Sequence, residues 1–125
     1  MRSLPVLISF AFLAGSGASA ASVPTERPVR LGQTAYVNGP RVTPIRVIED
    51  SRCPINARCI RAGTVVIRAR VSGGRWSRTL DLTLGQPVSV ADGSLVLAAV
   101  SPDRVAGKAL PRQRLRFTFN FEGGL

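Results

Sequence analysis

Thr64–Leu84 reads TVVIRARVSGGRWSRTLDLTL, and this stretch decides the fold class. Its first half places apolar side chains at every second position, at Val65, Ile67, Ala69 and Val71. Successive side chains of a β-strand point to opposite faces, so this spacing predicts a strand with one buried face. After the turn at residues 72–74, leucines repeat the same spacing up to Leu84. The stretch therefore predicts an antiparallel β-hairpin.

The rest of the chain also consists of short strand patterns and turns. The last pattern, Arg114–Glu122, would bury one leucine and three phenylalanines on one face and form a main wall of the core. Four further strands are predicted over Val29–Val37, Arg41–Asp50, Val88–Val90 and Leu95–Val100. A short helical turn fits within the longest loop, residues 101–113. Together these segments predict an all-β fold, a small antiparallel β-sandwich or barrel of about seven strands with one disulfide inside a loop.

Local features add detail to three of the predicted strands, those at residues 29–37, 41–50 and 95–100. Asn38-Gly39 indicates a turn, because both residues tolerate a positive φ. Pro44 has no N–H to donate, so its strand should lie at a sheet edge or contain a bulge. A period of two predicts one shared face for Thr43, Ile45, Val47 and Glu49. The continuous apolar run at residues 95–100 predicts a central strand that is covered on both faces.

The first twenty residues have the pattern of a signal peptide. Arg2 supplies the positive charge, Leu4–Gly15 is the apolar segment, and Ala18-Ser19-Ala20 is a small-residue cleavage motif. The apolar segment is too short to span about 30 Å of hydrocarbon. We therefore expect cleavage near Ala20, a flexible lead-in over residues 21–28 and a single β domain over residues 29–125. The mature chain would be periplasmic or secreted and would have no transmembrane segment.

Charge and composition narrow the classes of function. The chain has 17 Lys and Arg against 7 Asp and Glu, a formal net charge of +10, of which about +9 remains without Arg2. Such a surface attracts polyanions and anionic membrane faces. Export and the small number of aromatic residues argue against nucleic acid, because single-strand binders stack bases on exposed aromatics. The chain has no histidine, which removes the usual general base and the commonest metal ligand.

Between the second and third predicted strands lies Glu49–Gly63, which reads EDSRCPINARCIRAG and holds both cysteines. Export and the even count favour a disulfide between Cys53 and Cys59. Residues six apart on an extended strand lie about 20 Å from each other, so this bond requires a tight loop. Closing so short a ring should stabilise the fold by roughly 2 kcal/mol. Zinc is the rival interpretation, but it would have to recruit two carboxylates as ligands.

The motif Asp50-Ser51-Arg52-Cys53-Pro54, with Cys59 and Ala62-Gly63 after it, resembles one found in small exported bacterial all-β proteins of unknown function. In that group the pattern is Asp-Ser-Arg-Cys-Pro, four residues, Cys, two residues and Ala-Gly. Tryptophan commonly precedes the Ala-Gly pair, whereas this chain has Arg61, which weakens any prediction of an aromatic stacking surface. The resemblance covers about fifteen residues. It implies an exported all-β protein and carries no established activity.

The same loop is the first candidate for function. In one interpretation the disulfide rigidifies a recognition loop, because preorganised loops lose less entropy on binding. The candidate recognition residues are Asp50, Ser51, Arg52, Asn56, Arg58 and Arg61. In the structural alternative, the disulfide only staples a strand crossover, and Glu49 and Asp50 pair with Arg52. A narrower hypothesis is a protease inhibitor that presents Arg52 to a trypsin-like specificity pocket.

A second candidate surface is basic, and its partner would be an anionic component of the cell envelope. The candidate anion-binding residues are Arg68, Arg70, Arg75, Arg114 and Arg116. They would form one patch if the hairpin and the last strand were neighbours.

Catalysis is a third class of function. Glu49 and Asp50 would need a second carboxylate, from Asp81, Asp92 or Asp103, for chemistry such as glycoside hydrolysis. Neighbouring residues of one strand point to opposite faces, and so small a domain offers little room for a cleft. We therefore expect a monomeric, non-catalytic binding module whose partner is an unknown protein or an anionic envelope component. It would use neither a cofactor nor a metal.

Overall fold

The computed structural model describes residues 3, 5 and 27–123, so the predicted signal peptide lies almost entirely outside the described residues. The cleavage motif near Ala20 and most of the predicted lead-in lie outside them as well. Within residues 27–123 the chain forms antiparallel strands and one short 3-10 helix, η1 (Arg112–Arg114). The strands are β1 (Ala35–Tyr36), β2 (Arg41–Asp50), β3 (Val65–Gly73), β4 (Trp76–Thr83), β5 (Val88–Val90), β6 (Gly93–Ser101) and β7 (Arg116–Gly123).

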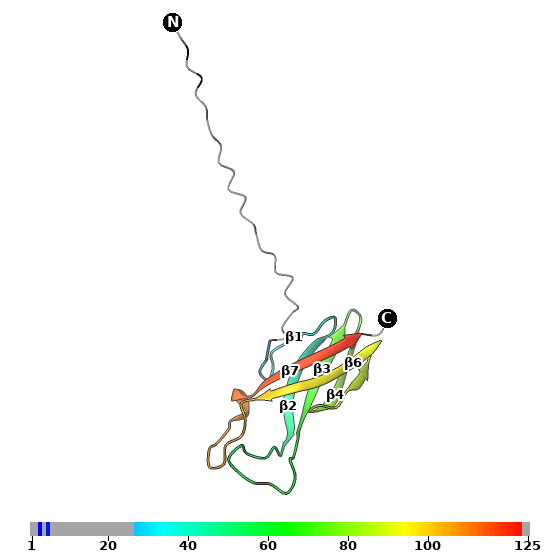
Figure 1. The fold of residues 1–125 in the computed structure, drawn as a ribbon. Helices are drawn as coiled ribbons and strands as arrows, with labels where there is room; N and C mark the ends of the chain where they lie inside the picture. Colours follow the sequence, from blue (N-terminus) through cyan, green and yellow to red (C-terminus); the bar gives the residue numbers. More distant parts are fainter. Residues whose placement is uncertain (1–2, 4, 6–26, 124–125) are drawn as a thin grey trace.

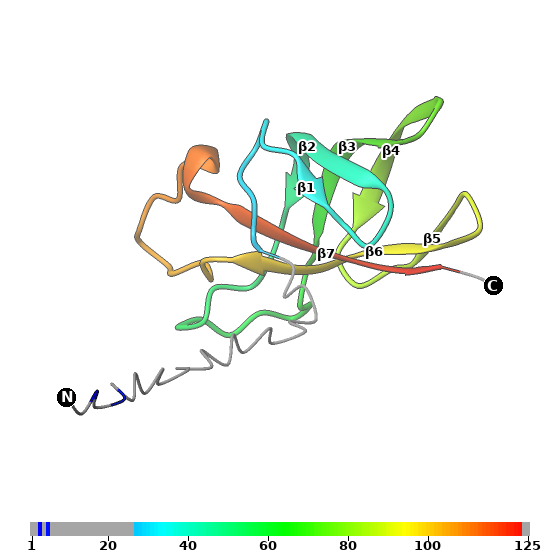
Figure 2. The same ribbon diagram turned by 90° about the horizontal axis from the view of Figure 1, so that it is seen from above.

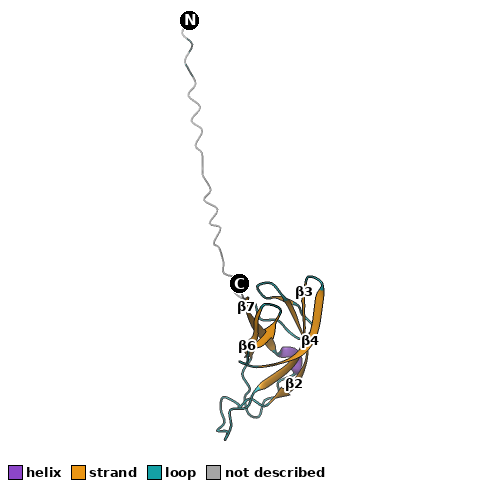
Figure 3. Cartoon of the chain, turned by 90° about the vertical axis from the view of Figure 1, so that its right-hand side faces the viewer, coloured by secondary structure: helices purple, strands orange, loops and turns teal. Residues whose placement is uncertain are grey.

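The strands form two sheets that pack against each other (Figures 1 and 3). One sheet has the order β1-β2-β3-β4 and the other has the order β5-β6-β7. All the strand pairs are antiparallel, and β3 pairs with β4 without interruption from Val66↔Thr83 to Gly73↔Trp76. These findings confirm the all-β fold class and the central hairpin. The predicted helical turn in the longest loop is also present, as η1.

The core lies between the sheets and is built from the residues that alternation predicts. In β3 the four apolar residues of the pattern, Val65, Ile67, Ala69 and Val71, are all buried. On the opposite wall, Leu115 and the three phenylalanines of β7 are buried. Phe117 and Phe119 are the largest fully buried side chains among the described residues, so β7 contributes most to the core of its sheet.

Short backbone contacts join the sheets at both edges. At one edge Val29 exchanges two hydrogen bonds with Phe117 of β7, at 2.9 and 2.7 Å, and Gly32 N donates to Pro44 O of β2 at 2.7 Å. At the other edge Gly85 N donates to Leu97 O of β6 at 2.9 Å. The molecule is thus a two-sheet sandwich with bridged edges, an arrangement close to a small barrel (Figure 2).

The predicted first strand, Val29–Val37, is wrong in its extent. Only Ala35–Tyr36 forms a strand, β1, which pairs with β2. The earlier part of the segment pairs instead with β7 through Val29. Because the segment changes partner from one sheet to the other, it cannot continue as a single strand. The turn that follows is confirmed, with φ of 48° at Asn38 and 131° at Gly39.

Strand β2 contains two irregularities in its pairing with β3, and they make the predicted shared face of its alternate residues wrong. The register shifts between Pro44 and Arg46 and again between Val47 and Glu49. Ile45 and Ile48 are the extra residues of these bulges, and both are exposed. A bulge changes which face the following residues occupy. Thr43, Ile45, Val47 and Glu49 therefore do not share the core face, whereas the bulge predicted at Pro44 is present.

Strand β6 is central in its sheet, but only one of its faces is covered. Leu95, Leu97 and Val100 are buried, whereas Ala98 and Ala99 are exposed. A register shift between Leu97 and Ala99 turns both alanines toward solvent. The prediction of a strand covered on both faces is therefore wrong.

Candidate functional site

Two loops lie side by side at one end of the sandwich (Figure 1). We call residues 51–64, between β2 and β3, the cysteine loop, and residues 102–111, between β6 and η1, the distal loop. The end of β7 and the β3–β4 turn lie at the opposite end of the molecule (Figure 1). The candidate recognition residues therefore occupy one pole of the molecule.

Hydrogen bonds of the backbone and of the Ser51 hydroxyl close the base of the cysteine loop. Ser51 N donates to Thr64 O at 2.8 Å, and Thr64 N donates to Ser51 Oγ at 3.0 Å. Further out, Cys53 N donates to Ala62 O at 3.0 Å. The predicted disulfide between Cys53 and Cys59 is present, with 5.9 Å between the two Cα atoms. The loop thus continues the β2–β3 pairing at its base and is closed covalently beyond it.

Asp50 and Arg52 form a bidentate ion pair that is largely shielded from water. Arg52 Nε donates to Asp50 Oδ1 at 2.8 Å and Nη2 donates to Oδ2 at 2.9 Å. Arg52 Nη1 donates to the carbonyl oxygens of Val100 and Pro102 at 3.2 and 3.1 Å. Only 12% of the Arg52 side chain and 17% of the Asp50 side chain are exposed. Arg52 therefore holds the distal loop against the base of the cysteine loop.

The surroundings of Asp50 shift its pKa in two opposing directions. Partial burial raises the pKa of the carboxyl, whereas the hydrogen bonds and charge of Arg52, together with the charge of Arg104, lower it. The net result is a pKa below the ordinary value of 3.8. Asp50 is therefore ionised at neutral pH and serves as the counter-charge for two arginines.

Arg104, in the distal loop, adds further hydrogen bonds between the distal loop and the base of the cysteine loop. Its Nη1 donates to Arg52 O at 3.0 Å and to Asp50 O at 3.4 Å. Its own carbonyl oxygen accepts from Ile55 N at 2.9 Å. Asn56 Oδ1 also accepts from Ala106 N at 2.8 Å. Arg104 was not among the residues predicted for the site, because nothing in the local pattern of residues 101–113 marks one arginine as a contact for a loop some fifty residues earlier.

Gly63, the last residue of the motif, occupies a position that only glycine fits without strain. Its φ is +68°, a conformation that L side chains rarely adopt, and a Cβ at this position would lie 1.7 Å from Ser51 O. Any larger residue would push the two ends of the cysteine loop apart. The motif residues Asp50, Ser51 and Gly63 therefore all hold the base of the loop. Of the pairing in the structural alternative, Asp50 with Arg52 is present, whereas Glu49 forms no ion pair among the described residues.

The outer part of the cysteine loop is different, because its side chains point into solvent. Arg58 and Arg61 are exposed, as are Ile55 at 68% and Ile60 at 103%. We call these four residues the loop tip. The two arginines were predicted as recognition residues, whereas the two isoleucines were not. Two apolar residues within a polar loop were the signal that would have identified them.

The candidate anion-binding residues do not form one patch. Arg68, Arg70 and Arg75 belong to the β3–β4 hairpin, whereas Arg114 and Arg116 lie at η1 and β7 beside the other sheet. The condition for a single patch, that these strands are neighbours, is not met. Several of these side chains are also engaged within the molecule. Arg68 pairs with Asp81 at 2.9 Å, Arg70 Nε donates to Ser77 Oγ at 3.0 Å, and Arg116 Nη1 donates to Gln113 O at 3.0 Å.

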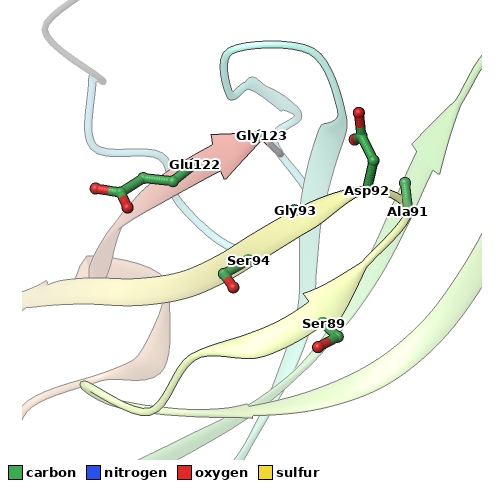
Figure 4. A pocket seen from close by; sticks show the side chains of 7 residues that line it. All are labelled: Ser89, Ala91, Asp92, Gly93, Ser94, Glu122 and Gly123. Atoms are coloured by element: carbon green, nitrogen blue, oxygen red, sulfur yellow. The ribbon is translucent and has the colours of Figure 1, made fainter. Parts of the chain in front are cut away.

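Two of the carboxylates considered for catalysis are engaged in ion pairs. Asp50 is paired with Arg52 and Asp81 with Arg68, while Glu49 is exposed on β2 and has no ion-pair partner among the described residues. Asp92 borders a shallow depression of about 460 Å³ formed by the β5–β6 turn and the end of β7. Glu122 borders the same depression, but the two carboxylates point in different directions (Figure 4). The depression is thus separate from the cysteine loop and offers no paired carboxylates.

Two further properties concern only residues 3, 5 and 27–123. These residues contain no group of three or more His, Cys, Asp or Glu side chains that could hold a metal ion. They also contain no helix that is long and apolar enough to cross a membrane.

A scan against protein-family models, a search of curated proteins and a search of solved structures each find no match.

Proposed function

We propose that this protein is an exported, non-catalytic interaction module that contacts its partner through the tip of the cysteine loop. One observation carries the proposal: the loop is locked at its base while the side chains at its tip remain in solvent. The disulfide, Arg52, Arg104 and Gly63 hold the backbone in place. The exposed tip contributes little to stability, which leaves it available for recognition.

The inhibitor hypothesis receives less support from this geometry. A specificity pocket needs an extended arginine in solvent, whereas the Arg52 side chain is 12% exposed and donates to Asp50 and to two backbone carbonyls. Releasing it would separate the two loops. Failure of the purified protein to inhibit trypsin-like proteases at micromolar concentration would exclude this hypothesis.

The basic strand faces are the other alternative. Their arginines are divided between two sheets, and Arg68 and Arg70 are engaged with Asp81 and Ser77. A double substitution of Arg68 and Arg70 should therefore leave partner binding unchanged, apart from a general loss of positive charge.

The proposed function can be tested by pull-down from solubilised cell envelope. We expect Arg58→Ser/Arg61→Ser to reduce recovery of the partner at least fivefold, because the substitutions remove exposed tip contacts without touching the fold. Arg75→Ser/Arg78→Ser is the matched control, since it removes the same charge from exposed residues of the distant β3–β4 hairpin. Cys53→Ser/Cys59→Ser, with its fold checked by circular dichroism, tests whether ring closure is needed. Equal recovery by all four proteins would overturn the proposal.

A further inference from the structure

Ile60 is the most exposed large apolar side chain of the described residues. It is 103% exposed, more than it would be in an extended reference peptide, and Ile55 of the same loop is 68% exposed. Single apolar residues on a protein surface are common and need no explanation. Ile60 differs because it directly follows the disulfide-closed ring of residues 53–59 and directly precedes the exposed Arg61.

The loop cannot cover this side chain by folding back. The disulfide, the contact of Cys53 N with Ala62 O and the hydrogen bonds from Arg104 hold its backbone. The tip is therefore presented to solvent in a fixed conformation. A partner that buries Ile60 would not have to pay the entropy of ordering the loop.

The charge around Ile60 indicates the chemistry of that partner. Arg58 and Arg61 flank it and are exposed, and residues 51–64 contain no acidic residue. Asp50, at the base, is already neutralised by Arg52. The chain as a whole has a net charge of +10. The surface that complements this tip is therefore anionic and has an apolar layer close beneath its charge.

A lipid surface meets both conditions better than a protein does. A stable protein interface buries about 800 Å² on each partner, and two isoleucines cannot supply its apolar centre. The depression of about 460 Å³ lies at the β5–β6 turn and not beside the loop. A membrane interface, by contrast, accepts a single apolar side chain without shape complementarity, and anionic headgroups attract basic residues beside it.

We infer that the loop tip docks on an anionic membrane surface, with Ile60 inserted at the boundary of headgroups and acyl chains. Arg58 and Arg61 contact the lipid phosphates, and Ile55 adds apolar contact. This inference rests on the proposed function, since it names the partner of the same loop.

The test is co-sedimentation with two kinds of vesicle, one of equal parts phosphatidylcholine and phosphatidylglycerol and one of phosphatidylcholine alone. The protein is taken in the form that an export-competent host produces, with its N-terminus determined by mass spectrometry. All variants share that N-terminus, so residues 4–15, if retained, would affect all of them equally. We expect binding to the anionic vesicles that weakens with salt, and much weaker binding to phosphatidylcholine.

Three variants then separate insertion from simple charge attraction. Ile60→Ser should weaken binding about tenfold, and Arg58→Ser/Arg61→Ser should weaken it about twentyfold, given the attraction of each basic residue to an anionic surface. Ile60→Trp should bind at least as well and show a blue-shifted emission on anionic vesicles that the wild type, with Trp76 alone, lacks. Ile48→Ser is the matched control, because it removes an exposed isoleucine from β2, and its binding should stay within twofold of wild type.

The outcomes distinguish the two proposals. Wild-type binding by Ile60→Ser, or no blue shift with Ile60→Trp, would overturn insertion and leave only charge attraction. Equal binding to both vesicle types would overturn the anionic requirement. Loop-dependent capture from the envelope without vesicle binding would overturn this inference but keep the proposed function, with a protein as the partner. Absence of loop dependence in both experiments would overturn both.

Discussion

Asp50 and Arg52 form a local ion pair that also contacts a distant segment of the chain. They are two positions apart, so their pairing is a local event. Yet Arg52 also donates to carbonyl oxygens 48 and 50 residues further along the chain. A charged hydrogen bond contributes more than a neutral one, and removing one partner leaves the other charge poorly solvated. This pair should therefore affect stability more than exposed ion pairs such as Arg68–Asp81.

The first prediction concerns Asp50→Asn. Because the pKa of Asp50 is lowered in the folded state, its ionised form stabilises the fold above the unfolded pKa near 3.8. That contribution is lost as pH falls through the lower folded pKa. At neutral pH we expect Asp50→Asn to lower the free energy of unfolding by about 1–2 kcal/mol. The difference from wild type, measured by urea unfolding, should shrink steadily below pH 4.

Asp92→Asn is the control for this experiment, because Asp92 is exposed in the β5–β6 turn. It should leave stability within about 0.5 kcal/mol of wild type. If Asp50→Asn were as stable as Asp92→Asn at neutral pH, the ion pair would have no part in holding the loops.

The second prediction compares two glycines with positive φ. Gly63→Ala should destabilise the protein by about 2 kcal/mol or more, because its Cβ would collide with Ser51 O in addition to the backbone strain. Gly107→Ala should cost only about 1 kcal/mol, since its φ is +83° but no atom lies within 4 Å of the added Cβ. Thermal unfolding of both variants measures the difference. Equal costs would show that the loop ends can separate without penalty.

At the scale of elements, β7 shows how far alternation alone predicts a strand. Its three phenylalanines are buried and the residues between them are more accessible, as the period of two requires. In β2 the same rule fails because bulges after Pro44 and Val47 add residues that no partner opposes. Alternation assumes an uninterrupted ladder, and only packing against the other sheet decides where the ladder breaks.

The third prediction belongs to β7. Phe119→Ala should lower the free energy of unfolding by about 3–5 kcal/mol, because it removes a fully buried aromatic side chain and leaves a cavity. Asn120→Ala, the neighbouring exposed position, should change it by less than about 0.5 kcal/mol. Chemical denaturation gives both values. Similar costs at the two positions would contradict the assigned face of the strand.

At the scale of the whole molecule, two edge contacts turn an open pair of sheets into a nearly closed structure. Val29 pairs with Phe117 at one edge and Gly85 with Leu97 at the other. Closed edges leave fewer unpaired backbone groups for association with another chain. This arrangement agrees with the expectation of a monomer, which stays a prediction.

The fourth prediction follows from these contacts. The amides of Phe117 and Gly85 should exchange hydrogen slowly, at rates within about tenfold of the rate of the Ile67 amide in the centre of β3. The reason is that their hydrogen bonds, to Val29 O and Leu97 O, are the edge contacts that close the sandwich. Native-state hydrogen exchange followed by NMR measures all three. Fast exchange at Phe117 alone would show that the segment around Val29 detaches while the sheets remain folded.

The sequence by itself determined the features that depend on neighbouring residues. It predicted the all-β class, the β3–β4 hairpin, the buried face of β7 and the disulfide of Cys53 with Cys59, because alternation, turn residues and cysteine spacing are local signals.

Only the tertiary structure decided which loop residues are inward and which remain for a partner. Arg52 became a structural anchor because the distal loop lies beside it, whereas Ile60, in the outer part of the same loop, stayed exposed. The basic strands were likewise separated by sheet order. These outcomes depend on contacts between segments some fifty residues apart, and a local pattern contains no information about such contacts.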